Sequence, residues 1–249
     1  MRNFIGKKGW GLSAAALIIL ILAPPTEAGS KINLTNVNQD DMNSMARELG
    51  LASSAIPLAP SEPLGLVLGL DVGLGVSVAD IHDEKTYWHS AIEGGNPKPV
   101  LILPQISVRK GIPLGIDLGA TYAPTVLGSN ISLVGGEVKW SFIKGSMLTP
   151  ALALRVNYHR ALGASDFSLQ TVSTDLSISK GLGPIKPYTG VGLSFIFFNP
   201  DTASLKKTEP RELKGYAGVR IKLMLIQIVP EIDLARNFLI YSLKVGLIL

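Results

Sequence analysis

The sequence predicts an all-β fold, a closed antiparallel transmembrane β-barrel of about ten strands with a short N-terminal helical segment. Three observations predict it: aliphatic residues alternate with a period of two, the positions between them are mostly small residues with scattered charges, and long connections alternate with short ones. The 249 residues are 47% hydrophobic and only 17% charged, whereas about a quarter of the residues of a soluble domain are charged. Cysteine is absent, which excludes disulfides, thiolate metal sites and a cysteine nucleophile.

The first segment, residues 1–28, is expected to be a signal peptide. Arg2, Lys7 and Lys8 make a basic start, residues 12–23 are uncharged and apolar, and Ala28 is a small residue at a cleavage position. An uncleaved membrane anchor is the alternative, but the apolar run of about a dozen residues is shorter than the roughly 20 that span hydrocarbon. Without this segment the formal net charge of +4 falls to +2, so no nucleic-acid partner is predicted.

The second segment, residues 29–63, is predicted to be periplasmic and to contain a short helix. Asp40 or Asp41 can cap this helix, and Gly50 can end it. Its apolar face consists of Met42, Met45, Ala46 and Leu49. Two interpretations are open: a plug in or across the periplasmic mouth, or a surface helix that tethers the barrel. The tether is favoured because a helix of about three turns is short.

The barrel is predicted over residues 64–249. Every even position from Leu64 to Val78 is a bulky aliphatic residue, and the odd positions are mostly glycine. A period of 3.6 would scatter these side chains around a helix, whereas a strand presents them all on one face. The pattern recurs with a phase-shifting bulge at Gly135 and Gly136. The ten predicted strands are 64–78, 100–109, 114–122, 137–142, 152–159, 172–179, 190–197, 213–223, 228–234 and 239–249.

The chemistry of the two stripes indicates which one faces lipid. The polar stripe is rich in Gly, Ala and Ser, as expected where side chains share a narrow closed lumen. The aliphatic stripe is then the lipid face, and an all-β chain can cross a bilayer only as a closed barrel. Connections near 111–113, 144–146, 181–183 and 224–225 are short, whereas those at 81–96, 124–130, 160–166 and 199–210 are longer. Short periplasmic turns and long extracellular loops are typical of the bacterial outer membrane.

Seven runs carry a resemblance to a known family. They are residues 60–65, 110–117, 128–131, 135–137, 149–155, 177–181 and 187–192. On these runs the chain resembles an uncharacterised family of Gram-negative outer-membrane β-barrel proteins. The resemblance implies a location in the cell outer membrane, with outer-membrane lipid and the outer-membrane assembly machinery as partners, and comes without an assigned activity. One departure is Leu249, because the assembly signals of such barrels usually end in an aromatic residue.

The inward charges are the one constellation that could carry chemistry. A structural network of ion pairs is the favoured interpretation, because buried ions need partners. A binding site or polar track for a small solute is the alternative, and general porin activity is not expected because a barrel of ten strands has a narrow bore. The predicted lumen network consists of Asp71, Arg109, Asp117, Glu137, Lys139, Arg155, His159, Asp175, Lys186, Arg220, Lys222, Glu231, Asp233 and Lys244.

Catalytic residues, metal ligands and cofactors are not predicted. The three histidines are His82, His89 and His159; the first two belong to a long loop, where polar residues are usually just solvated. His159 precedes Ser165 and Asp166 in sequence, which is a poor signal for a hydrolase. The sequence therefore predicts an outer-membrane barrel that is structural or handles a small solute. An outer-membrane lipid hydrolase or protease, and a loop-mediated surface docking protein, are the alternatives.

Overall fold

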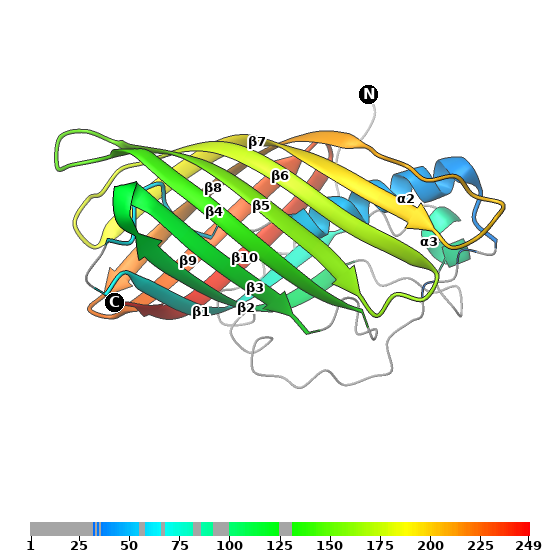
Figure 1. Cartoon of the computed structure of the whole chain (residues 1–249), viewed down its shortest axis with the longest axis horizontal. Coiled ribbons are helices and arrows are strands. Elements are labelled where there is room, and N and C mark those ends of the chain that lie inside the picture. The colour runs from blue at the N-terminus through cyan, green and yellow to red at the C-terminus, as the bar shows by residue number, and fades with distance from the viewer. Residues whose placement is uncertain are drawn as a thin grey trace, which may run out of the picture.

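The computed structural model describes residues 32, 34, 36–54, 58–65, 68–81, 86–91, 100–124 and 131–249. The predicted signal peptide lies outside the described residues. Ten antiparallel strands close into a barrel in which β1 pairs with both β2 and β10 (Figure 1). The predicted fold class and strand number are confirmed. Among the described residues, none of the helices has the length and apolar character needed to cross a membrane.

The strands follow one another around the barrel in chain order. They are β1 (Leu70–Asp80), β2 (Val100–Ile112), β3 (Ile116–Ala123), β4 (Ser132–Lys144), β5 (Ala151–Leu162), β6 (Phe167–Ser179), β7 (Ile185–Pro200), β8 (Arg211–Leu223), β9 (Ile226–Ala235) and β10 (Phe238–Ile248). Helix α2 (Gln39–Ser54) precedes β1, helix α3 (Thr86–Ala91) lies between β1 and β2, and the 3-10 turn η1 (Pro113–Gly115) joins β2 to β3.

Burial alternates along the strands as the period of two predicts. On β5, Arg155 and Asn157 are buried in the interior, whereas Leu154, Val156 and Tyr158 are exposed on the outside. Successive side chains of a strand point to opposite faces of the sheet, and in a closed barrel these faces are the lumen and the outer surface. The large aliphatic residues therefore lie outside and the charged residues inside.

The two ends of the barrel differ. The connections β2–β3, β4–β5, β6–β7 and β8–β9 lie together with the C-terminus at one end, called here the short-turn end (left in Figure 1). Helices α2 and α3 lie at the opposite, long-loop end. The predicted long connection at 160–166 is wrong: β5 continues to Leu162 and β6 begins at Phe167. The alternation of exposed and buried residues persists through Ala161, so these residues extend the strand.

The first strand begins later than predicted. Residues from Leu64 onward continue the alternation in sequence, but β1 starts at Leu70. Gly65 and Gly69 have φ angles of 88° and 45°, a left-handed conformation that glycine adopts readily and that is not extended. The amide of Gly111 donates a hydrogen bond of 2.7 Å to the carbonyl of Gly69. The chain therefore turns here before it enters the sheet.

The predicted bulge at Gly135 and Gly136 is also wrong. Both glycines pair in regular register with β3 and with β5. The irregularity lies between Trp140 and Ile143 on the β5 side. It leaves Phe142 and Ile143 exposed next to each other, because an extra residue in one strand shifts the alternation of faces.

Helix α2 differs from the prediction at both ends. The side-chain oxygen of Asn38 accepts a hydrogen bond of 2.9 Å from the Asp41 amide, so Asn38 caps the helix and neither Asp40 nor Asp41 does. The helix does not end at Gly50 but continues to Ser54. A Cβ at position 50 would lie 2.4 Å from Cγ2 of Ile196 on β7. Glycine is needed here because the helix packs closely against the wall.

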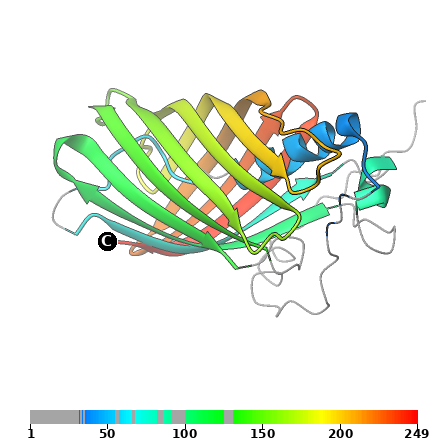
Figure 2. The same ribbon diagram turned by 45° about the vertical axis from the view of Figure 1, so that its right-hand side comes forward.

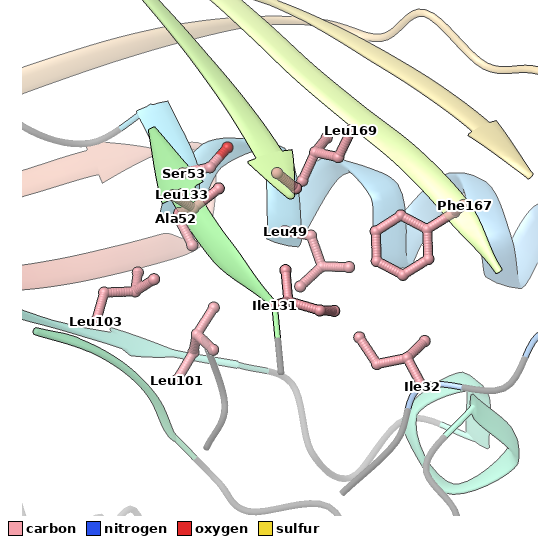
Figure 3. Close-up of a pocket in the computed structure, with 11 residues that line it drawn as sticks. Ile32, Leu49, Ala52, Ser53, Leu101, Leu103, Ile131, Leu133, Phe167 and Leu169 are labelled. Carbon is pink, nitrogen blue, oxygen red and sulfur yellow. The ribbon is translucent and has the colours of Figure 1, made fainter. Parts of the chain in front are cut away.

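The helix lies at the long-loop end of the barrel and is not on its outer surface. Its second half, from Leu49 to Ser54, is buried, and the helix contacts β5, β6, β7 and α3 (Figure 2). Figure 3 shows Leu49 and Ala52 among apolar side chains of the wall. The space left there is a cavity of about 20 Å³, room for about one water molecule. Helix α2 therefore lies within the barrel wall, at the end opposite the short turns.

We expect the substitution Gly50→Ala to weaken the packing of α2 against β7. The added methyl group would overlap the Ile196 side chain, and overpacking of a well-packed site costs about 1 to 3 kcal/mol. This loss exceeds the gain in helix propensity of about 1 kcal/mol at most. Urea unfolding of the refolded barrel measures it. Gly50→Ala should lower the free energy of unfolding less in a protein that already carries Ile196→Ala than in the parent, because the smaller side chain leaves room for the added methyl group. A Gly50→Ala protein as stable as the parent would contradict this packing.

Candidate functional site

The chain crosses the lumen lengthwise before it enters the sheet. After α2, the Leu58 amide donates a hydrogen bond of 3.0 Å to Glu231 on β9. Nearer the short-turn end, the Leu64 amide donates one of 3.1 Å to Asp117 on β3. Both carboxylates are buried inside the barrel. Residues 39–54 and 58–65 are called here the lumen segment, because together they run from the long-loop end to the short-turn end.

Buried cations of the wall bind carbonyl oxygens of the lumen segment. Lys214 donates to the carbonyl of Ser54 at 2.7 Å, and Arg155 donates to that of Ala59 at 3.0 Å. Lys139 donates to the carbonyls of Pro60 and Glu62 at 3.0 and 2.8 Å. An irregular backbone in an enclosed space leaves polar groups that need partners, and hydrogen bonds from charged donors are the stronger ones. Long cationic side chains therefore hold the segment without requiring it to be a strand.

Ser61 holds the lumen segment to the wall through three hydrogen bonds. It is fully buried, and its carbonyl accepts a hydrogen bond of 2.6 Å from Ser141. Its hydroxyl donates to Ser177 at 2.8 Å, and its amide donates to the hydroxyl of Ser179 at 3.1 Å. The next residue, Glu62, forms an ion pair with Lys186. The small polar residues of the inner wall thus supply hydrogen-bond partners as well as space for the segment.

One end of the ion network centres on Asp71 of β1. Its carboxylate lies 2.8 Å from Nζ of Lys244, 3.8 Å from Arg109 and 3.7 Å from Arg220. Gln227 donates a further hydrogen bond to it. All five side chains are buried. One carboxylate therefore lies among three cations, which come from β2, β8 and β10.

The network continues around the barrel through Glu137 and Asp175. Glu137 lies 3.0 Å from Arg109 and 3.6 Å from Arg155, and Arg155 lies 4.0 Å from Asp175. The hydroxyl of Tyr216 donates to Asp175. Because Arg155 also binds the lumen segment, this chain of ions joins the segment to the wall on several sides.

Glycines of the wall make room for these large inward side chains. A Cβ at Gly135 would lie 2.2 Å from Cδ2 of His159, and one at Gly190 would lie 2.4 Å from the Tyr216 ring. The glycine and the large residue face each other across paired strands. Small residues beside long ones are the packing expected of a narrow barrel that is filled.

The middle of α2 is held by helix α3 and by the wall. Glu48 is buried and accepts hydrogen bonds from the Tyr87 hydroxyl at 2.7 Å and from Nε1 of Trp88 at 2.8 Å. On the other side, Arg47 lies 3.3 Å from Glu212 of β8. Helix α2 is therefore held at the long-loop end by polar contacts in addition to its apolar packing against the wall.

The structure brings most of the predicted network residues together. Asp71, Arg109, Asp117, Glu137, Lys139, Arg155, His159, Asp175, Arg220, Glu231, Asp233 and Lys244 are buried on the inner wall. Lys186 and Lys222 are only half-buried, near the short-turn end. Lys186 pairs with Glu62 of the lumen segment. Glu231 accepts from the Tyr188 hydroxyl.

Sequence reasoning missed several members of the site. Glu212 and Lys214 flank the outward Leu213 on β8, so the alternation itself could have found them. Glu48 and Glu62 lie outside the strands, where no periodic signal marks them. The carbonyls of residues 54 and 59–62 have no sequence signature at all, because backbone groups are the same at every position.

A hydrolytic arrangement around His159 is not formed. His159 lies inside the barrel in register with Thr171. Ser165 is exposed in the β5–β6 connection, where its hydroxyl donates to Asp166. In the described part of the chain no hydrogen bond links His159 to either residue, and no three metal-ligating side chains gather. His82 lies outside the described residues, and His89 is exposed on α3.

The outer surface is a continuous apolar belt. Outward side chains on neighbouring strands are one third or more exposed, although they are large and hydrophobic. Members of the belt include Leu74, Val108, Leu118, Val138, Trp140, Leu154, Val156, Leu176, Val191, Leu193, Leu213, Ile232, Leu234 and Leu247. Monomeric soluble proteins rarely expose apolar patches larger than a few hundred Å². The belt therefore needs an apolar environment.

Fold and site together define a closed ten-stranded β-barrel whose own N-terminal segment lies in its lumen. The sequence matches no protein-family model and no curated protein. Three solved structures are similar in fold: a de novo designed transmembrane β-barrel, Neisserial surface protein A (NspA), and Ail, the attachment invasion locus protein of Yersinia pestis, in complex with the heparin analogue sucrose octasulfate.

The similarity to these structures is distant. Sequence identities are 12%, 12% and 8%, and TM-scores are 0.33, 0.31 and 0.29, respectively. The matches cover 71%, 72% and 71% of this chain and 93%, 96% and 93% of the other chains. At these values the similarity says nothing about function, and the closed barrel is established by its own strand pairing.

We expect Asp71→Asn to destabilise the barrel strongly. The substitution keeps the shape of the side chain but leaves Lys244, Arg109 and Arg220 around a neutral group, and breaking a buried ion pair costs about 3 to 5 kcal/mol. Urea unfolding in detergent measures the change. Asp201→Asn, at an exposed position of the β7–β8 connection, is the control and should change stability by less than about 0.5 kcal/mol. Equal effects of the two substitutions would show that the Asp71 cluster is not a stabilising centre.

Proposed function

We propose that this protein is an integral barrel of the bacterial outer membrane that is kept closed by its own N-terminal segment and serves a structural or surface-display role. The observation that carries the proposal is the lumen segment. Wall cations bind the carbonyls of Ser54, Ala59, Pro60 and Glu62, and its helix lies in the long-loop end. A lumen occupied in this way favours a closed barrel over a channel.

The apolar belt supports the membrane location. The side chains of the belt are those expected against acyl chains, and the aromatic residues Tyr122, Tyr158, Phe197 and Tyr241 lie among the exposed ones. Aromatic side chains of this kind gather at membrane interfaces. A closed barrel leaves no strand edge unpaired in hydrocarbon. Belt and closure together are the combination that a bilayer requires.

The location has a consequence for the N-terminal segment. Long connections of outer-membrane barrels face the cell exterior, and α2 lies at the long-loop end. In this orientation α2 closes the exterior mouth, and residues 58–65 lead from it toward the periplasm. The sequence predicts that the segment 29–63 is periplasmic. Under this proposal its described part instead lies inside the barrel, with its helix at the exterior mouth.

Handling of a small solute is a second candidate function. Several buried polar atoms have no hydrogen-bond partner among the described residues, including Nδ1 of His159, Oγ1 of Thr171 and Oγ of Ser173. His159 and Thr171 face each other on β5 and β6, and Ser173 is the next inward residue. Buried polar atoms normally have partners, so these three atoms are the groups that a small polar solute would bind. The conductance experiment below separates this function from the closed barrel.

We expect the full chain to give no stepwise conductance in a planar bilayer, because the lumen segment and the wall side chains fill the bore. A protein lacking residues 39–63 should show discrete conductance steps, since the segment then no longer occupies the lumen. Heat-dependent mobility in SDS gels verifies that both proteins are folded barrels before recording.

The controls make the outcome decisive. A shorter deletion within residues 202–204, in the β7–β8 connection, should leave the barrel closed. Steps of uniform size from the full chain would contradict the closed barrel and favour the transport of a small solute. Failure of the folded full chain to enter bilayers would contradict the membrane location itself.

A further inference from the structure

All four connections at the short-turn end share one composition. A lysine lies in each connection or up to three residues before it, and exposed aliphatic or methionine side chains follow within a few residues. The lysines are Lys110, Lys144, Lys180 and Lys222, and the apolar residues are Leu114, Met147, Leu148, Leu182, Met224 and Leu225. These residues are called here the lysine–apolar rim.

The apolar residues of the rim are among the most exposed in the described chain. Met147, Leu148 and Met224 are 93%, 91% and 90% exposed. A two-to-six-residue turn facing water needs only glycine and small polar residues, so large apolar tips on all four connections call for an apolar neighbour. The rim also continues the belt, since outward Ile143, Ile178 and Ile226 adjoin it.

The charge of the rim has a single sign. Residues 110–116, 142–150, 178–187 and 219–228 contain five lysines and one arginine and no aspartate or glutamate. Of the lysines, only Lys186 forms an ion pair within the described part of the chain, with Glu62. The arginine, Arg220, points into the lumen toward Asp71, and Lys222 lies on the same face of β8 and is half-buried at the short-turn end. The remaining four lysines are thus not neutralised by carboxylates of the described chain.

Two of these lysines are held in place by neighbouring backbone. Lys180 donates to the carbonyl of Met147 at 2.7 Å, which links the β6–β7 turn to the β4–β5 turn. Lys110 donates to the carbonyl of Leu68. Lys180 also donates to the carbonyl of Ser146 at 3.4 Å. Lysine has three donors on its ammonium group, so these contacts position the charge at the rim and leave at least one donor on each lysine for an anion.

We propose that the lysine–apolar rim binds the headgroups of anionic glycerophospholipids, with its leucine and methionine tips among the upper acyl chains. The inference rests on the membrane location proposed above and names the lipid class that the short-turn rim contacts. Basic residues at a membrane surface attract anionic lipids, by about 1 kcal/mol per residue. Apolar side chains beside them add burial in the acyl region. A protein partner would require acidic groups to meet the lysines and would not require continuity with the belt.

The test compares how spin-labelled phosphatidylglycerol and phosphatidylcholine associate with the full-length barrel in dioleoylphosphatidylcholine vesicles. The expected preference for phosphatidylglycerol is about fivefold, the equivalent of one fully engaged lysine. The triple variant Lys110→Gln, Lys144→Gln, Lys180→Gln should reduce the preference to about onefold. High salt should do the same for the unaltered protein, because screening at 1 M acts over about 3 Å.

The matched control removes the same charge at the opposite end. Arg160→Gln, Lys206→Gln, Lys207→Gln changes three exposed residues near the long-loop end and should leave the preference within about a factor of two of the parent. A parent protein without preference, or a preference lost equally in both variants, overturns the inference. Insertion into the phosphatidylcholine vesicles, which have no net charge, is measured first by protection from trypsin. It tests the membrane location separately. A barrel that inserts but shows no preference contradicts only the lipid assignment.

Discussion

The fold depends on the need to give the buried backbone and the buried charges inside a closed barrel partners. The backbone of the wall is satisfied by strand pairing around the full circle, but the lumen segment has no strand beside it. Its carbonyls are bound by Lys139, Arg155 and Lys214. Those cations in turn need anions, because an isolated buried charge costs several kcal/mol. The carboxylates of the wall, and the register that brings them close, follow from this one requirement.

Side-chain size lets the requirement be met in a bore of ten strands. Glycines face the largest inward residues, as Gly135 faces His159 and Gly190 faces Tyr216. Glycine makes room in the same way on α2, where Gly50 allows the helix to contact β7. The high glycine content of the chain is therefore a consequence of a filled interior, and an empty channel would not need it.

The sequence predicted the wall well and the contents of the lumen poorly. Alternation over residues such as 151–162 determines which side chains lie inside, so ten strands and most inward charges could be predicted. The position of α2 could not, because it depends on contacts with backbone carbonyls and on an apolar cluster assembled from distant strands. The start of β1 was missed because Leu64 to Gly69 keeps the alternation while the φ angles of Gly65 and Gly69 interrupt the strand. The cap at Asn38 was missed because two aspartates follow it closely.

The claim that the aliphatic stripe faces acyl chains is tested most directly by tryptophan fluorescence. Trp140 is outward and about half exposed, whereas Trp88 is buried beside α2. With Trp10 and Trp88 replaced by phenylalanine, lipids brominated along their acyl chains should quench Trp140 strongly. With Trp10 and Trp140 replaced instead, the same lipids should leave Trp88 nearly unquenched. Equal quenching of the two, or quenching of Trp140 by aqueous acrylamide alone, would contradict the account.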